Sequence, residues 1–404
     1  MQSKKEINEY VPIVFWLNLF IILFSSCGNR QALVKIDLIY LDAIKTLSPT
    51  VTAQVVHVGD KYFFYTAGEG SILESGEVNL KGNLNVGSTY KIANKFGGLR
   101  GLISTQINNT DFLIIGNKAE NAIEVHQINE KGRLQQISFF VDTDTTYLKT
   151  NITTQLVKIG EQQFVFVGGL DTGLSCLQLT GNGKLNHIQS MADDSTMFLN
   201  GIIGMSTLEI DGNTYLFTGG FIDGGISSFR VNKDGSFKNV DNIKDDEQLF
   251  LNGTFALNAV QLKRKNFLLV GHRHKVHYPF YEKEKGLIYH GDGINVFKVD
   301  GQGKLTLSSL LKDNDQLKLK GSTRIEHIKI NEDQAIVFIA TRDDEGIQIA
   351  ALNAKGILKP LKEYDIACTV YNGMTIEKIN DQWFLFIGAY NKHKANSYLI
   401  KMDR

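Results

Sequence analysis

The stretch Gly201–Ile243, GIIGMSTLEIDGNTYLFTGGFIDGGISSFRVNKDGSFKNVDNI, decides the fold of this 404-residue chain. It reads as four short β-strands, because turn sequences stand at Asp211–Asn213, Asp223–Gly225 and Lys233–Ser236. The second strand, Thr214–Gly219, is apolar for most of its length, which is typical of a strand buried on both faces. The stretch therefore predicts a four-stranded antiparallel sheet.

The sequence pattern that ends this second strand occurs in seven copies along the chain. The copies are FFYTAG, FLIIGN, FVFVGG, YLFTGG, FLLVGH, IVFIAT and FLFIGA. Self-similarity at a period near fifty residues, in units of short strands and Gly turns, is the signature of a β-propeller. The sequence predicts an all-β, seven-bladed propeller, and the small residue that ends each copy serves as an anchor for counting: Ala67, Gly116, Gly168, Gly219, Gly271, Ala340 and Gly388.

The two ends of the array predict how the ring closes. The last repeat runs out of chain about where its third turn should fall, so its outer strand is missing. Leu33–Ile44 is a strand-like segment without a blade of its own. We expect it to pair beside the strand near 397–402, which would leave no exposed edge for aggregation. The propeller domain is then 33–404.

The repeats resemble two known groups. The third and fourth copies, GGLDTGLSCLQL and GGFIDGGISSFRVNKDG, resemble repeats of large exported bacterial proteins that often carry calcium-binding RTX segments. The whole array resembles the seven-bladed, lactonase-like propellers related to 6-phosphogluconolactonase. That resemblance implies the fold over 33–404. It carries over no activity, because no catalytic motif of the family matches residue by residue.

The N-terminus indicates export. Lys4 and Lys5 precede an apolar run, Val11–Phe24, which has the length of a signal-peptide core and is short for a membrane span. The run ends before Cys27 in a sequence that resembles the lipobox of bacterial lipoproteins. The sequence predicts a signal peptide over 1–26 and a tether over 27–32. The resemblance to a lipobox implies lipidation at Cys27 and, because Gly28 follows the cysteine, an outer-membrane location in the cell envelope. The alternative is an ordinary cleaved signal peptide.

Composition excludes some functions and leaves others open. The 43 basic and 43 acidic residues balance, so no basic face indicates nucleic-acid binding. No Ser-His-Asp signature, phosphate loop or dinucleotide fingerprint is present. We expect Cys176 and Cys368 to be buried small hydrophobes and the protein to be a monomer.

Strand order places the loop into each inner strand and the loop after each second strand on one face, which we call the top face. The residue sixteen places before each anchor lies at the start of an inner strand and is apolar in most repeats. In two repeats it is an arginine, Arg100 or Arg324. Two guanidinium groups at one level of the channel could hold a carboxylate or phosphate. The alternative is that each arginine pairs with a nearby Asp or with Glu326 across the channel.

Acidic pairs precede several inner strands, among them Asp193, Asp194, Asp245 and Asp246. Clustered carboxylates could hold a divalent cation such as calcium. The alternative is turn formation, in which Asp binds its own backbone.

The fifth repeat is longer than the others by about seventeen residues, and the excess forms an insertion at about 272–292 on the same face. Its histidines could bind a metal, its aromatic residues could form a lid for a carbohydrate or a partner, or the loop could be passive. The candidate residues are His272, His274, His277, Tyr278, Tyr281, His290 and Asp292.

The absence of an acid/base motif favours a lipid-anchored module that binds a small ligand or an envelope protein through its top face. The alternative is an exported lactonase-like hydrolase in which a cation or the arginines polarise a carbonyl.

Overall fold

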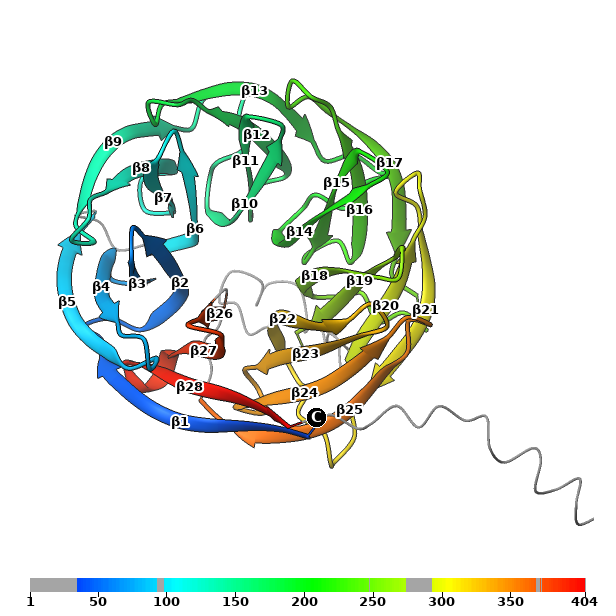
Figure 1. The fold of residues 1–404 in the computed structure, drawn as a ribbon. Helices are drawn as coiled ribbons and strands as arrows, with labels where there is room; N and C mark the ends of the chain where they lie inside the picture. The colour runs from blue at the N-terminus through cyan, green and yellow to red at the C-terminus, as the bar shows by residue number, and fades with distance from the viewer. Residues whose placement is uncertain are drawn as a thin grey trace, which may run out of the picture. The chain divides into compact units, whose positions relative to one another are not determined.

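The computed structural model describes residues 35–92, 98–246, 248–273, 293–367, 371 and 373–403. Leu38–Ile400 forms one compact unit, and the described chain ends outside it, 35–37 and 401–403, are the ends of two strands. Seven four-stranded antiparallel sheets form this unit, and they stand as blades around a central channel (Figure 1). The predicted seven-bladed propeller is confirmed.

The first four blades follow one another along the chain from the inner strand outward, and their strands have these bounds. Blade 1 comprises β2 (Thr50–Val58), β3 (Lys61–Gly68), β4 (Ile72–Val78) and β5 (Leu84–Lys91). Blade 2 comprises β6 (Leu99–Ile107), β7 (Thr110–Asn117), β8 (Ala122–Ile128) and β9 (Leu134–Val141). Blade 3 comprises β10 (Asn151–Ile159), β11 (Gln162–Gly169), β12 (Gly173–Leu179) and β13 (Leu185–Ala192). Blade 4 comprises β14 (Ile202–Ile210), β15 (Asn213–Gly220), β16 (Gly225–Val231) and β17 (Phe237–Lys244).

The last three blades include the insertion and the closing strand. Blade 5 comprises β18 (Thr254–Leu262), β19 (Lys265–His272), β20 (Gly293–Val299) and β21 (Leu305–Lys312). Blade 6 comprises β22 (Ser322–Asn331), β23 (Gln334–Thr341), β24 (Gly346–Asn353) and β25 (Leu358–Asp365). Blade 7 comprises β26 (Met374–Ile379), β27 (Gln382–Ala389), β28 (Lys394–Asp403) and β1 (Lys35–Lys45), with the 3₁₀ turn η1 (Tyr390–Lys392) between β27 and β28.

The N-terminal strand closes the ring as predicted. β1 is hydrogen-bonded to β28 and takes the outer place in blade 7. It also makes the contacts that link other outer strands: the amide of Leu84 donates to Asp42 of β1 at 3.2 Å, and the amide of Leu38 in β1 donates to the Tyr364 hydroxyl at 2.9 Å. Leu134 and Tyr90 form the same kind of link between blades 2 and 1. β1 therefore completes a belt of outer strands, although its sequence lies some 350 residues from β28.

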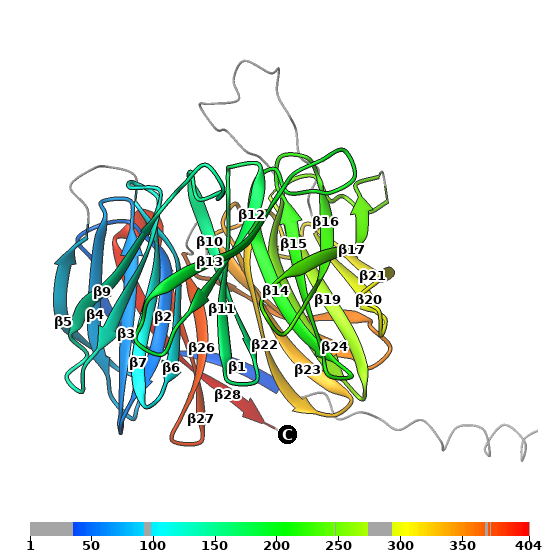
Figure 2. The same ribbon diagram turned by 90° about the horizontal axis from the view of Figure 1, so that it is seen from above.

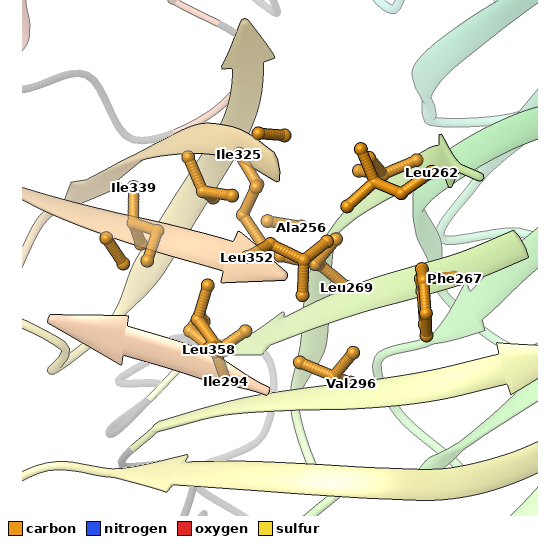
Figure 3. Close-up of a cluster of buried hydrophobic side chains, with 14 of the residues drawn as sticks. Ala256, Leu262, Phe267, Leu269, Ile294, Val296, Ile325, Ile339, Leu352 and Leu358 are labelled. Atoms are coloured by element: carbon orange, nitrogen blue, oxygen red, sulfur yellow. The ribbon is translucent and has the colours of Figure 1, made fainter. Parts of the chain in front are cut away.

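Apolar side chains fill the space between neighbouring blades. Between blades 5 and 6, Phe267 and Leu269 of β19 and Val296 of β20 lie against Ile339 and Leu352 of blade 6 (Figure 3). All five are fully buried. Because the second and third strands of a blade face a neighbour on both sides, they are apolar on both faces, as the unbroken hydrophobic runs indicate.

The glycine anchors let consecutive blades approach each other at the channel. A Cβ added at Gly168 would lie 2.5 Å from Cγ2 of Ile202, at the start of the next inner strand. At Gly116 it would lie 2.6 Å from Oδ1 of Asn151, and at Gly271 2.7 Å from Cβ of Ser322. Non-bonded atoms in real proteins do not approach each other this closely. The spacing between consecutive inner strands therefore explains why a small residue recurs at the anchors.

We expect Gly168→Ala to lower the free energy of unfolding by about 1–3 kcal/mol, because the added methyl group overpacks a filled interface. The measurement is the midpoint and slope of denaturant unfolding. Gly301→Ala is the matched control, since the nearest atom to its Cβ would be 3.8 Å away. Equal stability of the two variants would contradict the argument.

Candidate functional site at the channel mouth

Two sets of repeat-equivalent residues meet at the top of the channel, and we call them together the channel mouth. The first set opens the inner strands: Val51, Arg100, Ile152, Ile203 and Phe255. The second set stands two places after each anchor, in the loop that follows the second strand: Glu69, Lys118, Leu170, Phe221, Arg273, Arg342 and Tyr390. These loops lie along one edge of the ring in Figure 2.

The backbone holds the second set in the same way in four consecutive blades. The amides of Leu170, Phe221, Arg273 and Arg342 donate to the carbonyl groups of Thr150, Gly201, Gly253 and Gly321, at 2.9 to 3.2 Å. Each of these carbonyl groups belongs to the residue that precedes an inner strand or lies at its start. The residue two places after an anchor is therefore fixed over the channel whatever its side chain.

An apolar cluster forms the floor of the mouth. Phe221 of blade 4 packs edge-on against Phe255 of blade 5, with ring centroids 6.0 Å apart. Phe255 in turn stacks on Tyr371, which precedes blade 7, at 5.6 Å. Val51, Ile152 and Ile203 complete the buried part of the cluster. Members from five different blades meet, so the contacts run across the channel and not only between neighbours.

Arg100 is embedded in this floor with 1% of its surface exposed. Its Nη2 forms an ion pair with Oε1 of Glu69, and its guanidinium carbon lies 4.9 Å from the centroid of the Tyr371 ring. Its Nη1 donates to the carbonyl of Leu99 at 3.0 Å. Within the part of the chain that the structure describes, its Nε has no hydrogen-bond partner. Arg100 thus lies below the surface and fixes Glu69, whose side chain is 23% exposed.

Arg273 is a second buried cation in the mouth. It is 2% exposed, and its guanidinium carbon lies 5.4 Å from the centroid of the Phe255 ring. Its Nε also finds no partner among the described residues. Two arginines are therefore buried against aromatic rings, an arrangement in which the ring face offsets part of the cost of removing the cation from water.

Charged groups that reach the surface lie above these arginines. Arg342 is exposed, and Lys118 and Tyr390 are partly exposed. Burial lowers the pKa of Lys118, and the neighbouring charge of Arg100 lowers it further. Burial raises the pKa of Tyr390, with the Glu69 carboxylate as the next cause. These mutual effects place Glu69, Arg100, Lys118 and Tyr390 in one electrostatic neighbourhood.

The mouth has two sectors, an apolar sector and a charged sector, which are supplied by different blades. Blades 3 and 4 supply Leu170, Phe221 and Ile222, which are apolar. Blades 6, 7, 1 and 2 supply Arg342, Tyr390, Glu69 and Lys118, with Arg100 beneath them. The charged sector holds three cations and one carboxylate, so it is suited to a ligand that carries or develops negative charge.

Arg324 lies opposite the anchor Ala340 in its blade, as Arg100 lies opposite Gly116. Its Nη2 is 2.6 Å from Oε1 of Glu326, two residues further along the same strand, so this pair forms within β22 and does not cross the channel. The two arginines pair with different acids, and the structure places Arg324 beside Thr153, Gly204 and Ala256 in a narrow cavity of about 10 Å³. That space suits one water molecule.

His272 is the last residue of β19 and not part of an exposed loop. The insertion, which was predicted to begin at residue 272, therefore begins after His272. The side chain is fully buried, and neither ring nitrogen has a hydrogen-bond partner among the described residues. Burial lowers the pKa of its imidazole to about 3. The predicted lid residues His274, His277, Tyr278, Tyr281, His290 and Asp292 lie outside the described residues, as do Cys368 and the predicted lipidation site Cys27.

The acidic pairs of the top face are occupied by their own turns. Oδ1 of Asp193 accepts from the amide of Leu199 at 3.0 Å, and Oδ1 of Asp194 accepts from the amide of Thr196 at 2.7 Å. Asp245 and Asp246 repeat this pattern one blade later. The described residues contain no group of three or more His, Cys, Asp or Glu side chains that could hold a metal. The geometry therefore favours the turn-forming interpretation of these aspartates.

Sequence reasoning missed the second set of mouth residues. The count that located Arg100 ran backward from each anchor into the inner strand. The same count run forward by two residues gives Glu69, Lys118, Arg273 and Arg342. The signal was therefore present in the repeat pattern, but the residues were counted only backward from each anchor.

Comparisons with known proteins establish the fold. No protein-family model and no curated protein matches the chain. A Bacteroides fragilis protein described provisionally as a 6-phosphogluconolactonase has a TM-score of 0.54 at 18% identity, over 80% of this chain and 84% of that one. The periplasmic gluconolactonase of Pseudomonas aeruginosa has a TM-score of 0.56 at 13% identity, over 75% and 82%. A Lactobacillus plantarum protein has a TM-score of 0.54 at 14% identity, over 83% and 86%.

At these identities the likeness shows a shared propeller architecture. The resemblance to lactonase-like propellers that the repeat pattern indicates is thus confirmed for the fold. Among the described residues, no helix has the length and apolar character needed to cross a membrane.

The buried state of His272 predicts a specific acid sensitivity. Because the folded-state pKa lies below that of an unfolded histidine, unfolding takes up a proton, and stability falls as the pH drops from about 6.5 toward about 3. We expect His272→Asn, which places there the residue that blade 2 has at Asn117, to remove about 2–3 kcal/mol of the stability loss between pH 7 and 4.5. Urea unfolding across this pH range measures it.

His57→Asn, at an exposed position of β2, is the control and should retain the wild-type loss. If His272→Asn and the wild type lose stability in parallel, the imidazole is not held neutral in the folded protein.

Proposed function

We propose that the protein is an exported lactonase-like hydrolase that works at the channel mouth. The observation that carries the proposal is the charged sector, in which Arg342, Lys118 and Glu69 reach the surface and the buried Arg100 forms an ion pair with Glu69. Hydrolysis of a lactone builds negative charge on the carbonyl oxygen, and fixed cations stabilise that charge better than mobile water does. Two of the propellers that share this fold are described as a 6-phosphogluconolactonase and a gluconolactonase, which supports the same chemistry.

The roles follow from which groups are accessible. Arg342 and Lys118 polarise the carbonyl of the bound lactone, and Glu69 accepts a proton from the attacking water. The water oxygen bonds to the carbonyl carbon, the ring C–O bond breaks, and the released ring oxygen takes up a proton to give a hydroxy acid. Arg100 touches Glu69 from below and is a positioning residue, because it is buried.

A second function is supported by one observation. The mouth contains a cluster of buried apolar side chains from several blades, and such a cluster also suits a non-catalytic module that binds an organic acid. In that case the charged sector holds a ligand carboxylate without turnover. The two functions differ in whether a lactone is consumed.

We expect purified protein to hydrolyse a six-membered lactone such as δ-valerolactone, followed by acid release in a weakly buffered indicator assay. Arg342→Gln and Glu69→Gln should each lower kcat by about 10²–10³, since each removes one group that acts in the transition state. Lys265→Gln, an exposed cation at the first residue of β19, should leave the rate unchanged. Absence of turnover together with tight binding of the corresponding hydroxy acid would establish the binding module instead.

We also propose that the protein is held at the envelope by lipid on Cys27, and the periplasmic location of one propeller with this fold supports export. Two or more acyl chains give stable membrane attachment that one chain does not. Cys27→Ser should therefore release the protein into the soluble fraction, as immunoblots of separated membranes would show. A wild-type protein found soluble, with Cys27 unmodified by mass spectrometry, would overturn this proposal.

A further inference from the structure

The three side chains of the apolar sector offer a ligand no hydrogen-bonding group. Leu170, Phe221 and Ile222 have hydrocarbon side chains, and Leu170 and Ile222 are partly exposed above the buried Phe221 ring. Their amides are already engaged: Leu170 donates to Thr150 at 3.2 Å, Phe221 to Gly201 at 2.9 Å, and Ile222 to Asn200 at 3.2 Å. We call these three residues the apolar wall.

This wall has a clear consequence for the choice of ligand. A ligand hydroxyl pressed against it would lose its water partners and gain none, which costs free energy for every hydroxyl placed there. A methylene chain or an aromatic ring in the same place would gain from leaving water. The mouth therefore discriminates against a fully hydroxylated sugar acid on this side, although the charged sector opposite can hold an anionic or polarised group.

We infer that the lactone taken by this protein carries an aliphatic or aromatic substituent, with the substituent on the apolar wall and the ester group toward Lys118 and Arg342. This inference rests on the proposed hydrolase function for its catalytic part. It goes beyond that function in naming the class of substrate, an amphipathic lactone in place of the hydroxyl-rich lactone of a sugar acid. The aromatic stack of Phe221, Phe255 and Tyr371 continues the apolar surface below the wall.

The test compares three probes with the same six-membered ring. δ-Valerolactone has no substituent, δ-decalactone carries a pentyl chain, and glucono-δ-lactone carries hydroxyl groups. We expect kcat/KM for δ-decalactone to exceed that for glucono-δ-lactone by at least about tenfold, because several methylene groups leave water on the wall. A preference for glucono-δ-lactone, or equal values, would overturn the inference while leaving the hydrolase intact.

Two variants locate the effect on the wall. Leu170→Ser and Ile222→Ser should each lower kcat/KM for δ-decalactone about tenfold more than that for δ-valerolactone, since only the pentyl chain contacts the wall. Ile39→Ser removes an exposed aliphatic side chain from the outer strand β1 and is the matched control. An equal fall for both probes would show that the wall residues act on folding or on the ester group, which contradicts the inference.

A binding measurement separates this inference from the proposed function. If no lactone is turned over, the hydrolase proposal fails, and calorimetry with decanoate and gluconate still tests the ligand class. Tighter binding of decanoate, weakened by Ile222→Ser, supports the amphipathic ligand. Tighter or equal binding of gluconate overturns it.

Discussion

The close approach of consecutive blades at the channel is the constraint on which the rest of this structure depends. Each second strand ends where the next inner strand begins, and at Gly116, Gly168 and Gly271 the space for a Cβ is already filled by that neighbour. At these glycine anchors consecutive blades leave no room for a side chain, and Ala67 and Ala340 carry the smallest one at two other anchors. The requirement for a small residue recurs at each anchor because the geometry recurs.

The same constraint creates the channel mouth. Since the anchor is fixed against the next blade, the chain that follows it must turn over the channel, and its amide bonds the carbonyl at the start of the inner strand. In blades 3 to 6 this bond holds the residue two places after the anchor in the same way. The bond does not involve the side chain, so the residue can be Leu170 in one blade and Arg342 in another. The scaffold thus sets positions, and individual residues set the chemistry.

The sequence predicts the structural features that recur in every blade. It does not predict the contacts of a single residue that differs from the equivalent residues in the other blades. The period, the strand turns and the missing outer strand of blade 7 predicted the ring and the closing role of β1, because each follows from seven copies of one pattern. Arg100 was recognised by the same count. The position of Glu69 could have been found by counting forward from the anchor, but its ion pair with Arg100 depends on the spacing of two blades, which the repeat pattern does not give. His272 was assigned to the insertion because it begins a run of histidines, whereas β19 pairs through that residue and buries it.

Polar groups are buried at the mouth at a cost to the stability of the fold, which argues that the mouth serves a purpose other than folding. Arg100 and Arg273 are the largest fully buried side chains described in the structure, and His272 adjoins Arg273. Among the described residues, each of the three retains at least one buried nitrogen without a hydrogen-bond partner. Such atoms cost about 1–3 kcal/mol each, and apolar side chains like Ile152 and Ile203 fill the equivalent inner-strand positions without that cost. Four such atoms among the described residues thus belong to Arg100, His272 and Arg273 at the mouth, while others lie in further strands, for example in Thr218, Asn295 and Ser397. Local conflict with the rules of stable packing is expected at functional sites, and here it coincides with the mouth that the charged and apolar sectors define.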